Sequence, residues 1–192
     1  MALTQQNNFI TEQEYLLGEE ISAIKHELIN GDVYAMSGAS KNHERIAGSI
    51  YRKIGNFLEN SPCEPFSSDV KVKVENDFFY PDAMVVCEDE SSNEYYTESP
   101  TIIIEVLSKS TRRFDETVKR KAYQSIPALQ EYLLIEQEFI GVEVCRRKDN
   151  GQSSYYSVGD TFILDSIDLS IQVNELYNRV TFEDKLIQAL LE

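Results

Sequence analysis

The sequence predicts an α/β protein with a mixed β-sheet flanked by helices. A strand-like run at 101–107, a helical segment at 114–124 and a buried strand at 132–136 follow one another, as in a crossover unit with two parallel strands. An amphipathic helix at 42–59 precedes this unit, and further strands surround it. We expect one domain over residues 1–192, because 42% hydrophobic and 27% charged residues are an ordinary balance for one core.

The chain shows no segment for a membrane or for export. No run of about 18 apolar residues is present, and residues 1–9 are polar rather than built like a secretory signal. We therefore expect a protein of the cytoplasm with no membrane partner. Cys63, Cys87 and Cys145 are far apart and lack C-x-x-C spacing, which predicts buried free thiols rather than a disulfide framework or a zinc site.

The formal net charge of −15 argues against a broadly basic nucleic-acid binder, because Lys and Arg supply most of the non-specific affinity for phosphates. Positive charge is nevertheless concentrated at Arg112, Arg113, Lys119, Arg120 and Lys121. Since the chain has only two histidines, hard oxygen ligands are the metal chemistry that remains.

Two short elements are predicted near the N-terminus. Thr11-Glu12-Gln13-Glu14 has capping-box spacing, which predicts a helix that ends near Gly18. Asn30-Gly31, at the centre of 23–37, predicts a β-hairpin with Glu27 on its first strand. The helical periodicity that follows predicts a long helix capped by Asn42.

Alternating residues predict strands at 66–74 and 78–87 that pair antiparallel. This pairing would place Asp82 opposite residues 70–72, with Asp69 on the partner strand. The acidic, Ser- and Asn-rich segment 88–99 predicts a mobile loop. Later strands are expected at 141–147, at 154–158 after the turn Asp149-Asn150-Gly151, and in pieces to Val173, with a final helix from Thr181.

Glu105 is the most informative residue. It interrupts a strand that is otherwise apolar on both faces, where an ionised carboxylate costs several kcal/mol unless a positive group compensates it. A divalent cation and a buried arginine are roughly equal alternatives, because perturbed carboxylates mark both metal sites and ion-pair networks.

Asp82 favours the cation. It follows Pro81 on an earlier strand of the sheet, and carboxylates on adjacent strands about 4.8 Å apart can share one magnesium ion. Taken alone, Asp82 would be interpreted as a surface or turn-flanking aspartate.

The helix after Glu105 carries two candidate lysines. An α-helical period places Asp115 and Lys119 along one flank of an apolar stripe and Lys121 along the other, so both lysines can approach the sheet. The alternative is a surface ion pair between Asp115 and Lys119, with Lys121 solvated. The stripe itself consists of Phe114, Val118, Ala122 and Ile126.

These residues carry a family resemblance. The motifs are Tyr80-Pro81-Asp82, the run Ile104 to Ser108 with Ser110-Thr111-Arg112, then Asp115, Lys119 and Tyr123, and Glu131-Tyr132; Glu27-Leu28-Ile29, Gly31 and His43 extend them. Together they resemble the Uma-type restriction endonucleases of the PD-(D/E)XK superfamily over most of the chain.

The resemblance implies a restriction-endonuclease-like core with an N-terminal β-hairpin and additional C-terminal strands. It also implies a metal site at Asp82 and Glu105, completed by the main-chain carbonyl of Val106. This sequence has Leu107 where the superfamily has a lysine. Similar families supply that lysine from the following helix, so Lys119 is the first choice and Lys121 the reserve.

Three further residues are candidates for the site. Glu27 could extend the metal shell, although a strand-end glutamate is more often structural. His43 lies in the first turn of the long helix, where a packing or capping role is more common than that of a general base. Asp69 is a candidate for the acidic cluster.

We expect a Mg²⁺-dependent DNA endonuclease, with Mn²⁺ as a possible substitute, that forms a homodimer because double-strand cutting needs two centres. In this mechanism the cation polarises the phosphate while a lysine steadies developing charge. The alternative is a catalytically inactive member of the fold that binds nucleic acid or protein. A third hypothesis is a different metal-dependent phosphoesterase that acts on RNA or a small nucleotide.

Overall fold

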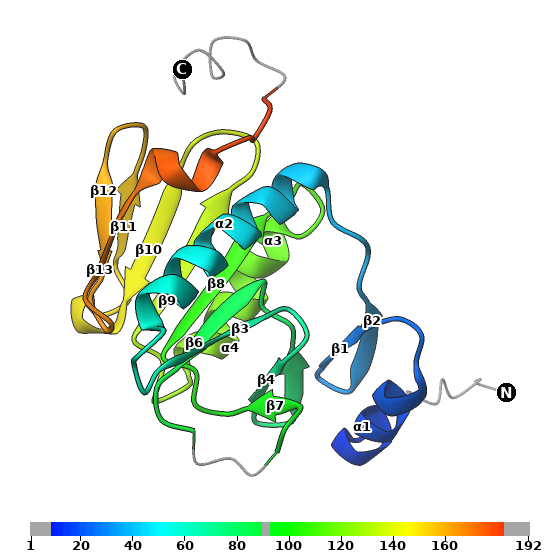
Figure 1. Cartoon of the computed structure of the whole chain (residues 1–192). Coiled ribbons are helices and arrows are strands. Elements are labelled where there is room, and N and C mark those ends of the chain that lie inside the picture. Colours follow the sequence, from blue (N-terminus) through cyan, green and yellow to red (C-terminus); the bar gives the residue numbers. More distant parts are fainter. Residues whose placement is uncertain (1–8, 90–92, 183–192) are drawn as a thin grey trace, which may run out of the picture.

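The computed structural model describes residues 9–89 and 93–182, and its strands form three sheets (Figure 1). The largest sheet contains β3 (Glu64–Ser67), β6 (Ala83–Val86), β8 (Ile102–Leu107), β9 (Glu131–Glu136), β10 (Val142–Arg146) and β11 (Ser153–Tyr156). The second contains β1 (His26–Ile29), β2 (Asp32–Ala35), β4 (Lys71–Val74), β5 (Asp77–Phe79) and β7 (Tyr96–Thr97). The third consists of β12 (Thr161–Leu164) and β13 (Leu169–Gln172).

The helices are fewer than the strands. They are α1 (Glu12–Ile21), α2 (Lys41–Leu58), α3 (Arg112–Phe114), the π-turn η1 (Asp115–Lys119), α4 (Arg120–Gln124) and the 3₁₀ turns η2 (Arg147–Asp149) and η3 (Val173–Tyr177). Within the described residues, none of these helices combines the length and the apolar character needed to cross a bilayer.

Strand order confirms the predicted fold class. The largest sheet runs β11-β10-β9-β8-β6-β3, with β8 and β9 parallel and the other neighbours antiparallel. The second sheet runs β2-β1-β5-β4-β7 and contains the predicted N-terminal hairpin, β1 with β2. The C-terminal strands β10 to β13 add to this core, so the structure is a mixed α+β fold.

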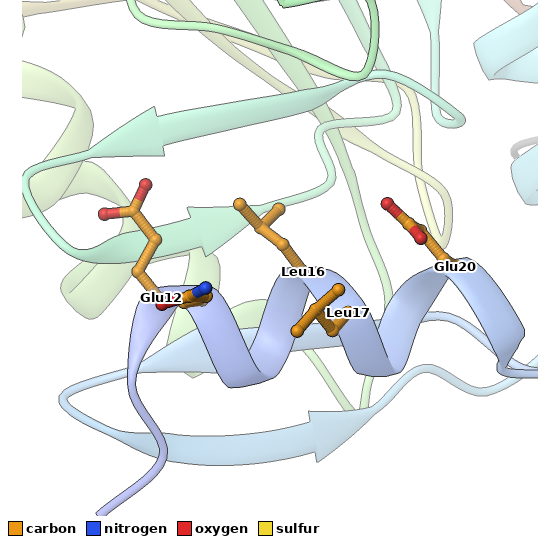
Figure 2. Close-up of a pocket in the computed structure, with 5 residues that line it drawn as sticks. Glu12, Leu16, Leu17 and Glu20 are labelled. Carbon is orange, nitrogen blue, oxygen red and sulfur yellow. The ribbon is translucent and has the colours of Figure 1, made fainter.

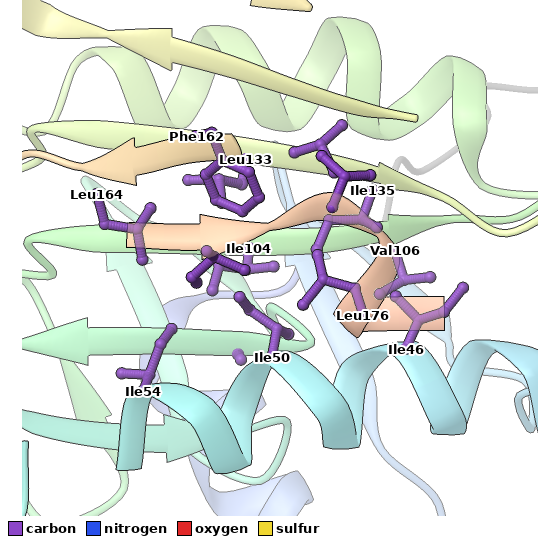
Figure 3. Packing of buried hydrophobic residues seen from close by; sticks show 14 of the residues in the cluster. Ile46, Ile50, Ile54, Ile104, Val106, Leu133, Ile135, Phe162, Leu164 and Leu176 are labelled. Atoms are coloured by element: carbon purple, nitrogen blue, oxygen red, sulfur yellow. The ribbon is translucent and has the colours of Figure 1, made fainter. Parts of the chain in front are cut away.

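Both faces of β8 are covered, as its apolar sequence predicts. On one face Ile104 and Val106 pack with Ile46 and Ile50 of α2, together with residues of β9, β12 and η3 (Figure 3). On the other face Ile103 belongs to a second apolar cluster that includes residues of α4 and of the five-stranded sheet. Because neighbouring residues of a strand face opposite sides, Glu105 lies on the α4 side.

The long helix begins two residues earlier than predicted. Ser40, not Asn42, is its N-cap: the Ser40 hydroxyl accepts a hydrogen bond from the His43 backbone N–H at 3.1 Å. The Asn42 side chain instead donates to the Thr181 carbonyl at 2.7 Å.

The first helix has the predicted capping box at Thr11 but continues past Gly18 to Ile21. Glu19, bound to His26, anchors this extra turn.

The two long strands predicted at 66–74 and 78–87 are each broken in two. Pro81 has no N–H to donate and ends the ladder, so β5 joins the second sheet while β6 joins the first. Asp82 therefore lies between strands and not opposite residues 70–72. Asp69 lies in the turn between β3 and β4, with 79% of its side chain exposed and its carboxylate paired with Lys25.

The acidic segment 88–99 was predicted as a loop throughout, but Tyr96–Thr97 forms β7, which pairs parallel with β4. Its pairing partner lies more than 20 residues away in sequence, so local composition gave no signal for it. The final helix predicted from Thr181 falls mainly on residues 183–192, outside the described residues.

The cysteine prediction was wrong for one pair. Cys63 and Cys87 form a disulfide, whereas Cys145 is a buried free thiol as expected. The pairing of β3 with β6 aligns Glu64 with Val86 and so brings the two flanking cysteines together. The register of β3 with β6 cannot be derived from the spacing of the cysteines. The prediction of long, continuous strands in this region did not include this pairing.

We expect Ser40→Ala to lower the free energy of unfolding by about 1 kcal/mol, because the N-cap oxygen then no longer satisfies the His43 backbone N–H. Urea unfolding followed by circular dichroism measures this loss. Ser40→Asp restores a capping oxygen and is expected to unfold close to wild type; equal losses in both variants would contradict the cap assignment.

Candidate active site

Asp82 lies directly before β6, and Glu105 lies on β8, the neighbouring strand of the sheet. The register of β6 and β8 aligns Ala83 with Ile104. Asp82 precedes the first of these residues and Glu105 follows the second, so the two acids are adjacent across an antiparallel pair. Glu105 is 3% exposed, in the middle of a strand that is buried throughout.

Lys119 reaches Glu105 from the helical segment. Its Nζ lies 3.0 Å from Glu105 Oε1, 2.9 Å from Glu27 Oε1 and 3.7 Å from Asp115 Oδ1. The Tyr123 hydroxyl donates to the same Glu105 oxygen at 3.1 Å. All five side chains are buried, so one ammonium group balances three surrounding carboxylates away from water. We call Glu27, Asp82, Glu105, Asp115 and Lys119 the carboxylate cluster.

Burial raises the pKa of Glu105 well above its usual value; Lys119 opposes this shift, while Asp115, Asp82 and Glu27 add to it. Burial also raises the pKa of Asp115, to about 6. For Lys119 burial lowers the pKa, but the carboxylates of Glu105, Glu27 and Asp115 outweigh burial and raise it. The lysine is therefore charged, and the cluster holds more acids than cations.

Asp82 is fixed by a backbone donor and a histidine. Its Oδ2 accepts from the Val106 N–H at 2.7 Å and lies 3.2 Å from His43 Nε2. Burial lowers the pKa of His43, but the hydrogen bond and the charge of Asp82 reverse this effect and raise it. His43, which the sequence suggested as a packing or capping residue, thus contacts the first acid of the predicted metal pair.

Glu27 connects the N-terminal hairpin to this cluster. The same oxygen that contacts Lys119 accepts the Tyr80 backbone N–H at 2.9 Å. This bond ties β1 to the turn in which Pro81 and Asp82 lie. Glu27 therefore joins the hairpin, the Asp82 turn and the helix.

The helical segment differs from the predicted α-helix, because Asp115–Lys119 form a π-turn. The buried residues are Asp115, Lys119 and Tyr123, whereas Val118, expected on the apolar stripe, is 39% exposed. The rest of the predicted stripe does face the core: Ile126 is buried, and Phe114 and Ala122 pack against the apolar cluster on the α4 side. The π-turn adds Asp115 and Lys119 to the buried side and leaves Val118 outside it. Lys121, the reserve lysine, is exposed.

The basic residues near the site are largely paired with acids. Arg112 binds Glu136, and Arg120 Nη1 lies 2.8 Å from Glu143 Oε1. Lys119 is enclosed within the cluster. The concentration of positive charge that the sequence shows between 112 and 121 is therefore mostly neutralised in the fold.

The donor set suits a magnesium ion that keeps part of its water shell. Across residues 9–89 and 93–182, no three His, Cys, Asp or Glu side chains converge as a metal-binding group. Magnesium, however, is commonly bound through one or two carboxylates together with water and substrate phosphate, rather than by a complete protein cage. Asp82 and Glu105 are carboxylates of this kind at neighbouring positions, and the excess of acids over cations in the cluster favours a further cation.

Two hollows of the described chain lie away from these residues. One is lined by Glu12, Gln13, Leu16, Leu17 and Glu20 of α1 (Figure 2). Another lies between α2 and β13. Neither contains a residue of the carboxylate cluster.

A family model described as "Putative restriction endonuclease", Uma2, matches residues 12–174. The chain belongs to the Uma2 family. Two relatives come from Synechocystis sp. (strain ATCC 27184 / PCC 6803 / Kazusa). "Uncharacterized protein slr1290" is 35% identical over 179 residues, covering 90% of this chain and 94% of the relative. "Uncharacterized protein sll1609" is 34% identical over 165 residues, covering 83% and 88%.

A solved structure has the same fold as this Uma2 chain. The crystal structure of "a putative nuclease belonging to DUF820" from Anabaena variabilis ATCC 29413 superposes with a TM-score of 0.73 over 90% of this chain and 99% of that chain. Sequence identity is 17%, so the likeness concerns the fold. The expected family and the nuclease fold are thus confirmed, and together they support a nuclease.

In this Uma2 chain an apolar residue occupies the position where the superfamily has its lysine. Leu107, at the expected lysine position, is 2% exposed and packs in the apolar cluster on the α4 side of the sheet. The ammonium beside Glu105 comes from Lys119 instead. Asp115 belongs to the cluster, and Tyr123 contacts Glu105. Both residues are four positions from Lys119 in the sequence, but an α-helical period did not place them facing Glu105.

We expect Lys119→Met to lower the free energy of unfolding by about 3–5 kcal/mol at neutral pH, because three buried carboxylates lose their shared cation. Without that cation the carboxylates bind protons more tightly, so the loss should be larger at pH 8 than at pH 5. Urea unfolding at both pH values measures it. Lys121→Met, on the same helix but exposed, should stay within about 0.5 kcal/mol of wild type.

The buried carboxyl group of Asp115 should give the free energy of unfolding a second dependence on pH. Its pKa is raised to about 6 in the folded protein, so its contribution to stability is full below the ordinary aspartate pKa and is lost as pH rises through about 6. Asp115→Asn should flatten the dependence of the unfolding free energy on pH between about 4 and 6. Chemical unfolding at intervals over this range tests it, with Asp149→Asn, an exposed aspartate, expected to retain the wild-type slope.

Proposed function

We propose that this Uma2 protein is a magnesium-dependent endonuclease that hydrolyses phosphodiester bonds of DNA. The position of Lys119 supports this most strongly: its Nζ lies 3.0 Å from Glu105 Oε1 although it comes from the helix and not from β8. An adjacent acid pair can hold a metal ion, and a charged lysine beside it can stabilise the charge that develops on a phosphate, which together suit metal-assisted phosphodiester hydrolysis. The family match and the nuclease fold point to the same reaction class.

In this proposal Asp82, Glu105 and the Val106 carbonyl hold the metal, with Mn²⁺ as a substitute for Mg²⁺. When bound, the ion would polarise the scissile phosphate and lower the pKa of a coordinated water. The Val106 N–H and His43 hold Asp82 in place, and Tyr123 holds Glu105. These contacts keep the two acids oriented.

Lys119 has two roles in the proposal. Its ammonium neutralises Glu105 and Glu27 in the metal-free protein, and it provides a fixed positive charge next to the reacting phosphate. Because its charged form is strongly favoured, it acts as an electrostatic group and not as a general base. Lys121 and Asp69, both at the surface, have no part in this mechanism.

The proposal extends to the setting of the reaction. We infer a homodimer, because cutting both strands of a duplex requires two centres, and a single domain acting in the cytoplasm. The second apolar cluster joins residues of the five-stranded sheet to residues of the six-stranded sheet, which supports treating the chain as one unit.

We expect Asp82→Ala and Glu105→Ala to reduce magnesium-dependent cleavage of supercoiled plasmid by roughly 100-fold or more, because each removes a carboxylate that holds the ion. Lys119→Met should cause a comparable loss, whereas Lys121→Met should cleave like wild type. Circular dichroism of each variant controls for folding. Cleavage that persists in folded Asp82→Ala and Glu105→Ala would refute the proposed site.

A second function is favoured by specific observations. Leu107 occupies the expected lysine position, and the arginines nearest the site are paired with acids. These features suit a catalytically inactive nuclease fold that binds nucleic acid or protein.

Calorimetric titration with Mg²⁺ or Mn²⁺ separates the two functions. The endonuclease requires binding that Asp82→Ala abolishes and that Asp69→Ala leaves unchanged, since Asp69 is exposed and paired with Lys25. Absence of any Asp82-dependent binding would favour the inactive module. The same titrated protein, tested on RNA and on nucleotides, addresses the phosphoesterase alternative.

A further inference from the structure

The π-turn at Asp115–Lys119 brings three residues to one side of the helical segment. Asp115, Lys119 and Tyr123 recur every fourth residue, and in an α-helix of 3.6 residues per turn such residues drift by about 40° per step and about 80° over two steps. A π-turn is wider and removes part of this drift. All three side chains are consequently buried, and two of them contact Glu105.

The backbone bonds of this turn differ from those of an α-helix. The Asp115 carbonyl accepts the N–H of Arg120, five residues later, which is the bonding pattern of a π-turn. The same carbonyl also accepts the hydroxyl of Tyr132 at 3.1 Å. Tyr132 lies on β9, paired with Ile103 of β8, so this hydrogen bond connects the π-turn to the central sheet.

Tyr132 is almost fully buried, and its hydroxyl is directed to a main-chain carbonyl and not to a carboxylate. The adjacent Tyr123 has a different role, because its hydroxyl binds Glu105. The two rings pack edge to face with centroids 5.4 Å apart. Replacing Tyr132 by phenylalanine would therefore keep the ring packing and remove the bond to the turn.

We propose that Tyr132 is a positioning residue: its hydroxyl holds the π-turn in register and so places Lys119 against Glu105. Isolated π-turns within helices occur frequently at functional sites, and here the extra residue aligns the lysine with the acid pair. The expected effect of Tyr132 on cleavage rests on the proposed function. The expected effect of Tyr132 on the position of Lys119 does not depend on any activity.

The test compares Tyr132→Phe with Tyr177→Phe. Tyr177 is a matched control because it is also fully buried and its hydroxyl also binds the main chain: it lies within donating distance of the Glu136 and Gly141 carbonyls, at 2.9 and 2.8 Å, and accepts the Gly141 N–H at 3.0 Å. NMR of ¹⁵N-labelled protein follows the side-chain ammonium resonance of Lys119, assigned by its loss in Lys119→Met. Hydrogen exchange follows the Arg120 amide, which donates within the turn.

In Tyr132→Phe we expect the Lys119 resonance to shift or exchange with water and the Arg120 amide to exchange faster, whereas Tyr177→Phe leaves both unchanged. Cleavage by Tyr132→Phe should lose about 10- to 100-fold in kcat with KM changed less than about twofold, because the lysine is displaced while substrate contacts remain. Wild-type NMR behaviour in Tyr132→Phe would overturn the inference. If the wild type cleaves no substrate, the proposed function fails, and the NMR comparison still decides the role of Tyr132.

Discussion

The ammonium group of Lys119, enclosed between Glu105 and Glu27, is the interaction on which the site depends. Each partner belongs to a different part of the fold: the helical segment, the central strand and the N-terminal hairpin. Buried carboxylates at this density repel one another, and burial without a cation would favour their protonated forms. The lysine offsets part of the repulsion among these acids, but burial still raises the pKa of Glu105 and of Asp115, so a bound divalent cation would add positive charge that the cluster lacks.

Two hydrogen bonds from the main chain then determine how the acids lie. The Val106 N–H binds Asp82, and the Tyr80 N–H binds Glu27. The Tyr80 N–H lies next to the break that Pro81 introduces between β5 and β6, whereas the Val106 N–H belongs to the central strand β8. One donor from the break and one from the central strand therefore orient the two carboxylates.

Much of the fold could be predicted from the sequence, because hydrophobic periodicity and turn residues are local signals. The hairpin at Asn30-Gly31 and the buried strand around Glu105 follow from such signals, whereas Asp82 and Lys119 were singled out through the family resemblance, and their roles belong to the proposed function. What could not be predicted depends on tertiary structure. The Cys63–Cys87 disulfide depends on strand register, and the contact of His43 with Asp82 depends on where α2 begins above the sheet. The π-turn at Asp115–Lys119 departs from the constant α-helical period on which the prediction for this helix was based.

The spread of the cluster along the chain has a consequence for folding. Glu27 and Lys119 are separated by most of the described sequence, and their contact closes a very long loop. Contacts of such sequence separation cost the most loop-closure entropy and tend to slow folding. A chain that has formed only its local hairpins and helices therefore has no assembled site. On a ribosome, Glu105 would meet Lys119 only after the helical segment that follows β8 had emerged, and strands β9 to β13 of the same core would still have to be made.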